Sequence, residues 1–176
     1  MRGLLVGRFQ PFHRGHLSVV REIRTLRPEE PLLLGLGSAQ ASYTWENPFT
    51  AGERTEMIAR ALAEAGLTGV TTVPLVDIDR HALWVAHVES LLPPFDRVYT
   101  NNPLTRLLFE RAGYVVEGPP MFERERYEGA RIRSRMAAGE EWSDLVPPAT
   151  ASYLESIRAA HRLRQLAHAG GSRSVP

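Results

Sequence analysis

Two short apolar runs near the start of the sequence constrain the fold most. They are RGLLVG at 2–7 and PLLLGLG at 31–37, and glycine or proline bounds each of them. Runs of this length and composition are typical of strands that are buried on both faces. Between them lies a stripe of apolar residues at helical spacing: Val19, Val20, Ile23 and Leu26. This segment therefore predicts a strand, a helix and a strand, the repeating unit of a parallel sheet covered by helices.

The same alternation continues along the chain. It predicts a helix that begins at the capping box Thr50–Glu53, a strand at 70–77, a helix at 81–92, a strand at 96–100, a helix at 103–112 and a strand at 114–117. Pro74 favours an edge position for the strand at 70–77. We therefore expect an α/β fold with a doubly wound, mostly parallel sheet. Charged helical patterns follow, which predict a helical C-terminal part over about 121–169 with a last helix at 150–168.

The length of 176 residues suits one domain. We expect that single domain to cover 1–169, with an α/β core over about 1–118. The end of the sequence, 170–176, reads GGSRSVP and is predicted to be disordered.

Composition excludes several kinds of chemistry. Cysteine is absent, which excludes thiol nucleophiles, disulfides and iron–sulfur clusters. All 21 basic residues are arginine, so the chain has no lysine for a Walker A phosphate site or a Schiff base. With 20 acidic residues the formal net charge is +1, and we expect no nucleic-acid partner. No apolar run approaches the length of a membrane span and no secretory signal is visible, so we expect no membrane partner and a cytoplasmic location.

The segment after the first predicted strand, GRFQPFHRGH at 7–16, carries the clearest chemistry. It places His13 and His16 three residues apart in a loop that enters a helix. The free N–H groups and the dipole of that helix end favour an anion, and Gly15 lacks the Cβ that would keep a phosphate at a distance. Two histidines at this spacing could also be metal ligands or surface residues. A metal would need a third ligand, and the spacing of His81 and His87 selects neither. We therefore favour an anion site and expect no resident metal.

GRFQPFHRGH resembles the HxGH signature of nucleotidyltransferases. Five further blocks occur in order: GSAQ at 37–40, NPFTAGER at 47–54, ALWV at 82–85, PPFDRVY at 93–99 and RIRSRM at 131–136. Together with the signature they are similar to the archaeal-type nicotinamide-nucleotide adenylyltransferases over roughly residues 1–158. The resemblance implies a Rossmann-like fold and a homo-oligomer such as a hexamer.

The resemblance also implies an activity, the transfer of AMP from ATP to nicotinamide mononucleotide, which yields NAD and pyrophosphate. The 5′-phosphate of the mononucleotide would attack directly, without a covalent intermediate, and Mg²⁺ would be carried on ATP. His16 would contact the α-phosphate, while His13, Arg8 and Arg133 would complete the catalytic group. The implied ATP-binding residues also include Gly7, Phe9, Gln10, Gly15, Asn101, Asn102 and Arg131.

Four residues are implied for the mononucleotide: Ser38, Asp77, His81 and Trp84. The resemblance makes Trp84 a platform for the nicotinamide ring, although its place beside Val88 and Leu91 on a helical stripe also fits core packing. Asn101 and Asn102 would face the adenosine, and the same pair beside a proline also fits a turn and a helix cap.

Three segments depart from the family pattern, at four positions in all. Glu128-Gly129-Ala130 stands where Ser-Gly-Thr is usual, Glu46 stands for an arginine, and His81 stands for an asparagine. Arg124, Arg126 and Arg131 could replace the lost charge, or this arginine-rich run could be a solvated face. Two alternative functions therefore stay open. One is an HxGH nucleotidyltransferase acting on nicotinate mononucleotide, pantetheine phosphate or a flavin nucleotide, and the other is a nucleotide-binding regulatory module without catalysis.

Overall fold

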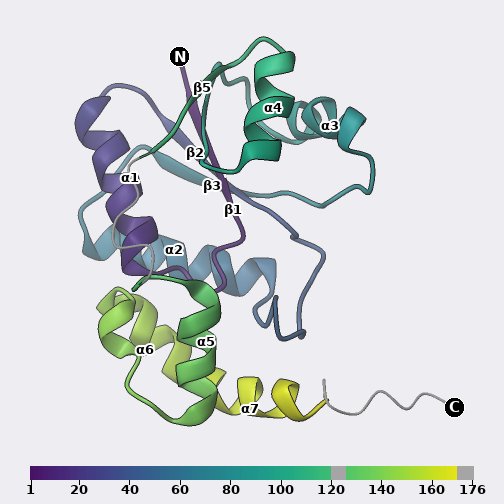
Figure 1. Ribbon diagram of the computed structural model, residues 1–176. Helices are drawn as coiled ribbons and strands as arrows, with labels where there is room; N and C mark the ends of the chain where they lie inside the picture. Colours follow the sequence, from purple (N-terminus) through teal and green to yellow (C-terminus); the bar gives the residue numbers. More distant parts are fainter. Residues whose placement is uncertain (120–125, 170–176) are drawn as a thin grey trace, which may run out of the picture.

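A computed structural model describes residues 1–119 and 126–169. Its sheet contains β1 (Gly3–Gly7), β2 (Leu32–Leu36), β3 (Val70–Pro74), β4 (Arg97–Tyr99) and β5 (Val115–Glu117). The strand order is β3-β2-β1-β4-β5, and every pairing in the described part of the chain is parallel (Figure 1). The predicted α/β class and doubly wound sheet are therefore confirmed. β3 ends at Pro74 and lies at an edge, where the missing N–H of proline is tolerated.

Helices cover both faces of the sheet. Two of them, α1 (Arg14–Leu26) and α2 (Ala51–Glu64), pack against Leu5, Leu34 and Leu36 on one face. The turn η1 (His81–Leu83), α3 (Trp84–Leu91) and α4 (Pro103–Arg111) belong to the other face, where Leu4 and Leu33 are buried. Alternate strand residues thus feed two separate apolar clusters. β1 and β4 are neighbours in the sheet, but α1, which follows β1, covers one face, and α4, which follows β4, covers the other. Ligands of open α/β sheets bind beyond the strand ends at such a point.

The C-terminal part consists of α5 (Gly129–Ala138), the turn η2 (Ser143–Leu145), α6 (Pro148–Ser156) and α7 (Ala159–Ala169). The single helix predicted over 150–168 is wrong, because the chain breaks at Arg158, which adopts a left-handed φ of 54°. The break turns α7 so that Leu163 joins Leu154 in the same buried cluster as α1 and α2. Leu163 is fully buried. The C-terminal helices therefore share their core with one face of the sheet, which supports our proposal that 1–169 is one domain.

The capping box predicted at the start of α2 is present. The Thr50 hydroxyl accepts the N–H of Glu53, and the Glu53 carboxylate accepts the N–H of Thr50. None of the helices in the described ranges is both long and apolar enough to cross a membrane. The predicted tail at 170–176 lies outside the described residues.

Candidate active site

The two histidines of the HxGH segment lie side by side where α1 begins. His13 is the N-cap, and its Nδ1 accepts a hydrogen bond from the backbone N–H of His16 at 3.2 Å. The Nδ1 of His16 accepts the backbone N–H of His13 at 3.3 Å. The rings stack with centroids 3.5 Å apart. This arrangement is a capping box made of two imidazoles, and each Nδ1 can accept only while it is unprotonated.

Both imidazoles are therefore neutral at pH 7 and carry their proton on Nε2. Burial lowers the pKa of His13 from 6.5 to about 4. Burial, and then repulsion by His13, lowers the pKa of His16 well below 6.5. Each ring thus offers an Nε2–H donor, and the end of α1 adds roughly half a positive charge. Two neutral donors at a helix N-terminus suit a phosphate.

Aromatic side chains support the histidine pair. Phe9 meets the ring of His16 edge-on at 4.8 Å between centroids, and Phe12 stacks on it at 5.6 Å. Tyr127 lies parallel to His13 at 6.4 Å. Phe9 was predicted to bind ATP, but its side chain is buried beneath His16. We therefore assign Phe9 to the support of that ring.

The structure gives the two loop glycines a different purpose from the predicted one. A Cβ at Gly15 would lie 3.0 Å from the Cβ of Tyr127 and 3.2 Å from the ring of His13. A Cβ at Gly7 would lie 2.7 Å from the ring of Phe9. Protein atoms lie in both spaces, so glycine at these positions allows the aromatic supports to pack against the loop.

Gln10 holds the loop to two distant segments. Its side-chain amide donates to the carbonyl of Phe49 and accepts the Phe49 N–H, both at 3.0 Å. Its own carbonyl accepts from Nη1 of Arg133 at 2.7 Å. The side chain is buried and both ends of its amide are engaged. Gln10, predicted to bind ATP, is therefore assigned to positioning the loop.

Arg133 brings a group of charges together beside this loop. Burial lowers the pKa of Arg133 and the charge of Arg8 lowers it further, whereas Glu46 and Glu128 act in the opposite direction. Arg8, Glu46 and Glu128 are thus each within electrostatic reach of Arg133, and all three are exposed. The Nε of Arg133 is buried and has no hydrogen-bond partner among the described residues. The two carboxylates that depart from the family pattern therefore act electrostatically on Arg133, one of the predicted phosphate arginines.

The other residues of the arginine-rich run are spread out. Arg131 and Ala130 are exposed on α5. Arg126 is exposed, and its Nη2 lies 3.5 Å from Oδ2 of Asp144. Arg124 lies outside the described residues.

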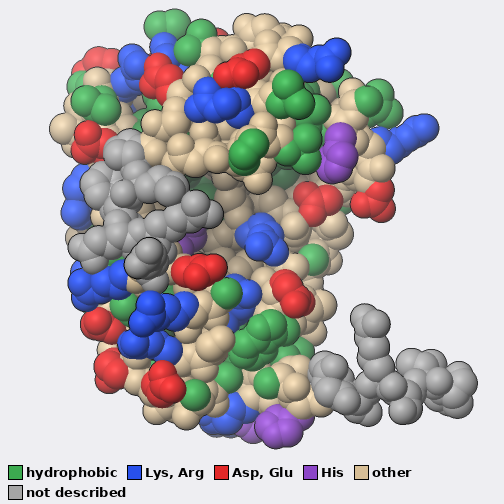
Figure 2. All heavy atoms as spheres, viewed as in Figure 1, with side chains coloured by type: hydrophobic (Ala, Val, Ile, Leu, Met, Phe, Trp, Pro, Cys, Tyr) green, Lys and Arg blue, Asp and Glu red, His purple; other side chains and the backbone are tan. Residues whose placement is uncertain are grey.

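Three of the four residues predicted for the mononucleotide, Asp77, His81 and Trp84, line a separate cavity of about 430 Å³. Its lining includes Asp77, Asp79, His81, Trp84 and Asn102. Figure 2 shows the molecule hollowed between the part with α3 and α4 and the part with α5, with charged side chains of both signs around the hollow. Trp84 is half-buried and also packs edge-on against Phe109, at 5.5 Å between centroids. Trp84 therefore both packs against the core and lines the cavity.

Ser38 does not line the cavity but holds one of its carboxylates. The Ser38 hydroxyl donates to Asp77 at 2.6 Å, and the Ser38 N–H donates to the other carboxylate oxygen at 3.3 Å. Asn102 caps α4 by accepting the N–H of Thr105, so the helix-cap interpretation is confirmed for it. Asn102 also lines the cavity that includes Trp84. Asn101 donates to the carbonyl of Pro119 at 2.8 Å.

Sequence reasoning missed Arg54, which is fully buried and contacts the loops after β1 and β2. The signal was present, because Arg54 is in helical register with Met57, Ile58 and Ala61 on the buried stripe of α2. It also missed Asp79 and Tyr127, for which the sequence holds no comparable signal. The described residues contain no group of three or more His, Asp or Glu side chains that could hold a metal ion.

Comparisons with known proteins identify the family. The family model described as Cytidylyltransferase-like matches residues 4–135. The nicotinamide-nucleotide adenylyltransferase of Haloarcula marismortui is 50% identical over 175 residues, which cover 99% of this chain and 90% of that protein. The enzyme of the same name from Methanolobus tindarius is 47% identical over 165 residues, or 94% of each chain.

A solved structure shares the fold. It is a bifunctional NMN adenylyltransferase/ADP ribose pyrophosphatase from Francisella tularensis, complexed with AMP and a manganese ion, with a TM-score of 0.78 and 20% identity. The similarity covers 93% of this chain, which spans about half (51%) of that protein. The family model and the relatives that match almost the whole sequence show that the chain belongs to the nicotinamide-nucleotide adenylyltransferase family.

Proposed function

We propose that the chain transfers the adenylyl group of ATP to nicotinamide mononucleotide and releases NAD and pyrophosphate. The observation that carries this proposal is the pair of neutral imidazoles at the start of α1, at the switch point of the sheet. The family name and the separate cavity that contains Trp84 support the choice of acceptor.

The reaction needs little chemistry from the protein. An oxygen of the mononucleotide 5′-phosphate forms a bond to the α-phosphorus of ATP, and the bond from that phosphorus to the bridging oxygen breaks. Pyrophosphate leaves with the electron pair, and Mg²⁺ enters and leaves as part of the nucleotide. The attacking phosphate is already ionised, so no general base is required. Catalysis therefore depends on positioning and on stabilising negative charge at the α-phosphate.

The residues divide into two groups under this proposal. His16 donates from Nε2 to the α-phosphate as charge develops, and His13, Arg8 and Arg133 hold the rest of the polyphosphate. Because the imidazoles are neutral, each Nδ1 keeps its hydrogen bond within the cap and each Nε2–H donates to the phosphate. Asp77, His81 and Trp84 surround the pyridine ring, and two carboxylates in that cavity suit its positive charge.

One assay tests the proposal against its alternatives. The purified chain is incubated with ATP, Mg²⁺ and, in parallel, nicotinamide mononucleotide, nicotinate mononucleotide, pantetheine phosphate or flavin mononucleotide. We expect pyrophosphate and NAD in the first reaction. Product with only a different acceptor would make the chain another HxGH nucleotidyltransferase. ATP binding without pyrophosphate in any reaction would make it a regulatory module.

A further inference from the structure

Arg54 is an unusual side chain for the interior of this protein. It lies in the first turn of α2 and is 0% exposed. Arginine is rarely buried completely unless it is paired with an acid. Within 1–119 and 126–169, no carboxylate forms an ion pair with Arg54, although Asp77 is near enough to raise its pKa against the larger lowering effect of burial. The reason for a buried charge at this position must therefore lie in its other partners.

Those partners are carbonyl groups where two strands end. Nη1 donates to the carbonyl oxygens of Arg8 and Gly37, each at 2.8 Å. Nη2 donates to the carbonyl of Ser38 at 3.1 Å. Arg8 follows β1 and the other two residues follow β2. A guanidinium has five donors in a planar fork, so it can hold several carbonyls at once.

The two loops lead to the two halves of the candidate site. Arg8 continues into the histidine segment and belongs to the charge cluster of Arg133. Ser38 holds Asp77, which lines the mononucleotide cavity. Ser38 also adopts a left-handed φ of 51°, a conformation that costs energy for a residue with a Cβ. The bonds of its carbonyl to Arg54 and of its N–H and hydroxyl to Asp77 hold that conformation.

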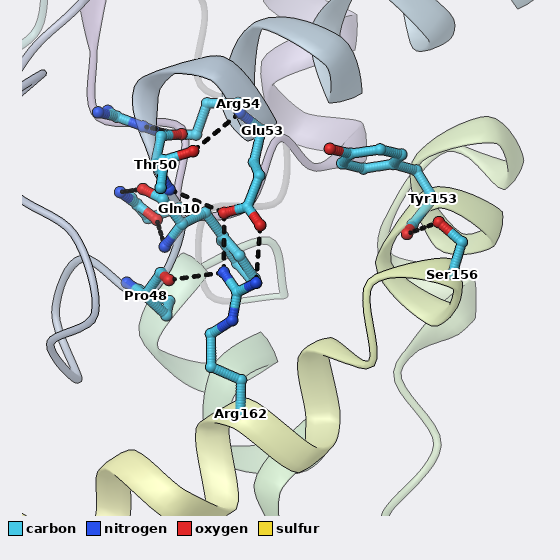
Figure 3. Close-up of polar contacts among 9 residues, drawn as sticks. Gln10, Pro48, Thr50, Glu53, Arg54, Tyr153, Ser156 and Arg162 are labelled. Carbon is cyan, nitrogen blue, oxygen red and sulfur yellow. Dashed lines mark hydrogen bonds and ion pairs between the residues drawn. The ribbon is translucent and has the colours of Figure 1, made fainter.

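Arg54 is itself held by the start of α2. Figure 3 shows it beside Thr50 and Glu53, with Arg162 reaching from α7 to the Glu53 carboxylate. The Nε of Arg54 lies 3.4 Å from the carbonyl of Thr50. The guanidinium is thus anchored on a capped helix end rather than on a loop.

We propose that Arg54 is a positioning residue that fixes the separation of the polyphosphate and mononucleotide halves of the site. This inference rests on the proposed function, because a fixed separation matters most when one bound nucleotide attacks another. Reacting atoms must lie about 3 to 3.5 Å apart, and a shift of about 1 Å can lower turnover roughly a hundredfold. Lysine keeps the charge but has a single nitrogen, which cannot reproduce the fork.

The test compares Arg54→Lys with the parent and with Arg60→Met, a control on the exposed side of the same helix where Arg60 pairs with Glu56. Turnover is normalised to the number of sites that bind a non-hydrolysable ATP analogue by calorimetry. We expect Arg54→Lys to lower kcat per site by about a hundredfold, and to weaken the ATP analogue and nicotinamide mononucleotide by less than about tenfold each. Arg60→Met should keep the parental kcat. Parental kcat per site in Arg54→Lys would overturn the proposal.

A second variant keeps the test decisive if Arg54→Lys does not fold. Ser38→Ala removes only the hydroxyl that holds Asp77, so it should weaken mononucleotide binding several-fold and leave the ATP analogue unaffected. Equal effects on the two ligands, or no effect on either, would contradict the arrangement in which the two loops lead to separate halves of the site. These affinities are measured without turnover, so they remain informative if the parent makes no NAD. Absence of NAD from the parent would overturn the proposed function, whereas parental kcat per site in Arg54→Lys, or parental affinity for nicotinamide mononucleotide in Ser38→Ala, would overturn the role of Arg54.

Discussion

At the scale of single residues, His16 combines a cap with a proposed catalytic donor. Its Nδ1 accepts the His13 N–H, which leaves Nε2–H for the α-phosphate. We expect His16→Ala to lower kcat by roughly 10² to 10³, the usual cost of one preorganised donor, with little change in the affinity for ATP. Loss of the cap should also lower the free energy of unfolding by about 1 kcal/mol. Parental kcat in the fully folded variant would remove His16 from the mechanism.

His13 links the stability of the fold to pH. In the unfolded chain its imidazole takes up a proton near pH 6.5, whereas in the folded protein burial delays protonation to about pH 4. The stability linked to neutral His13 is therefore complete above about pH 6.5 and is lost as the pH falls toward about 4, at up to about 1.4 kcal/mol per pH unit within that window. Urea unfolding between pH 7.5 and pH 5 measures this slope.

The matched variant for this slope is His13→Asn. Asparagine can still accept at the N-cap but does not titrate. The free energy of unfolding of the variant should therefore depend less steeply on pH, by the contribution of one titrating group. His161→Asn, on the exposed side of α7, controls for the loss of an imidazole elsewhere. A parent whose stability does not change between pH 7.5 and pH 5 would mean that folded His13 takes up the proton freely.

The sequence was informative about single residues where a local pattern encoded them. The two histidines were predictable because their spacing and the helix after them are local. The structural contacts of Gln10 and Arg54 were not predictable because their partners lie 39 and 46 residues away, and only the folded sheet brings them together. Gly15 was predicted to let a phosphate approach, and in the structure the space of its missing Cβ lies against Tyr127 and His13; no local pattern could reveal the contact with Tyr127.

At the scale of elements, Glu53 and Arg162 attach α7 to the start of α2. The two side chains form a pair of hydrogen bonds, each 2.7 Å long, and are only 17% and 16% exposed. Burial would raise the pKa of Glu53, but hydrogen bonds from Arg162 and Thr50 outweigh it and lower the pKa. The attachment is therefore present at neutral pH and is lost as acid protonates Glu53.

We expect Arg162→Met to lower the free energy of unfolding by about 2 kcal/mol, because paired hydrogen bonds between charged groups are the strong ones. A double-mutant cycle with Glu53→Gln should give a coupling energy of about 1 kcal/mol or more. The exposed pair of Arg60 and Glu56 serves as a control, and its cycle should give no more than about 0.5 kcal/mol. Equal coupling energies in the two cycles would mean that the contact of α7 is no stronger than a surface pair.

The elements themselves were largely predictable, since strands buried on both faces and a capped amphipathic helix have strong local patterns. The five predicted strands all occur, each shorter than or equal to its apolar run. The exception is the break between α6 and α7. Arg158 carries no signal for a left-handed conformation, and the turn is favoured by the burial of Leu163 against helices far away in the sequence.

At the scale of the whole molecule, the near balance of charge hides an uneven distribution. Arg8 and Arg133 lie with Glu46 and Glu128 on one side of the site. Asp77 and Asp79 lie on the other. The proposed ATP side thus combines the arginines proposed to bind phosphate with carboxylates that would repel phosphate. At 4 Å such repulsion is worth about 1 kcal/mol per pair in water and several times more where water is excluded.

This distribution leads to a prediction about the departures from the family pattern. Glu46→Arg with Ala130→Thr should strengthen ATP binding by about fivefold or more, because a repulsion becomes an attraction and a hydroxyl donor is added. The gain should be largest at low salt, where the Debye length grows from about 10 Å at 0.1 M to about 30 Å at 0.01 M. Titration calorimetry at these two salt concentrations measures it. Glu155→Arg, on the exposed side of α6, makes the same change in net charge and controls for it.

The alternative is that Glu46 and Glu128 stay in solvent when ATP binds and that Arg131 supplies the contact. The double variant would then bind ATP as the parent does, and Arg131→Ala would weaken binding. The position of Glu46 and Glu128 within reach of Arg133 favours the first outcome, since their charges already act on a buried phosphate arginine. An ATP affinity that responds to neither the double variant nor Arg131→Ala would mean that neither segment touches the phosphates, and the histidine loop alone would then hold them.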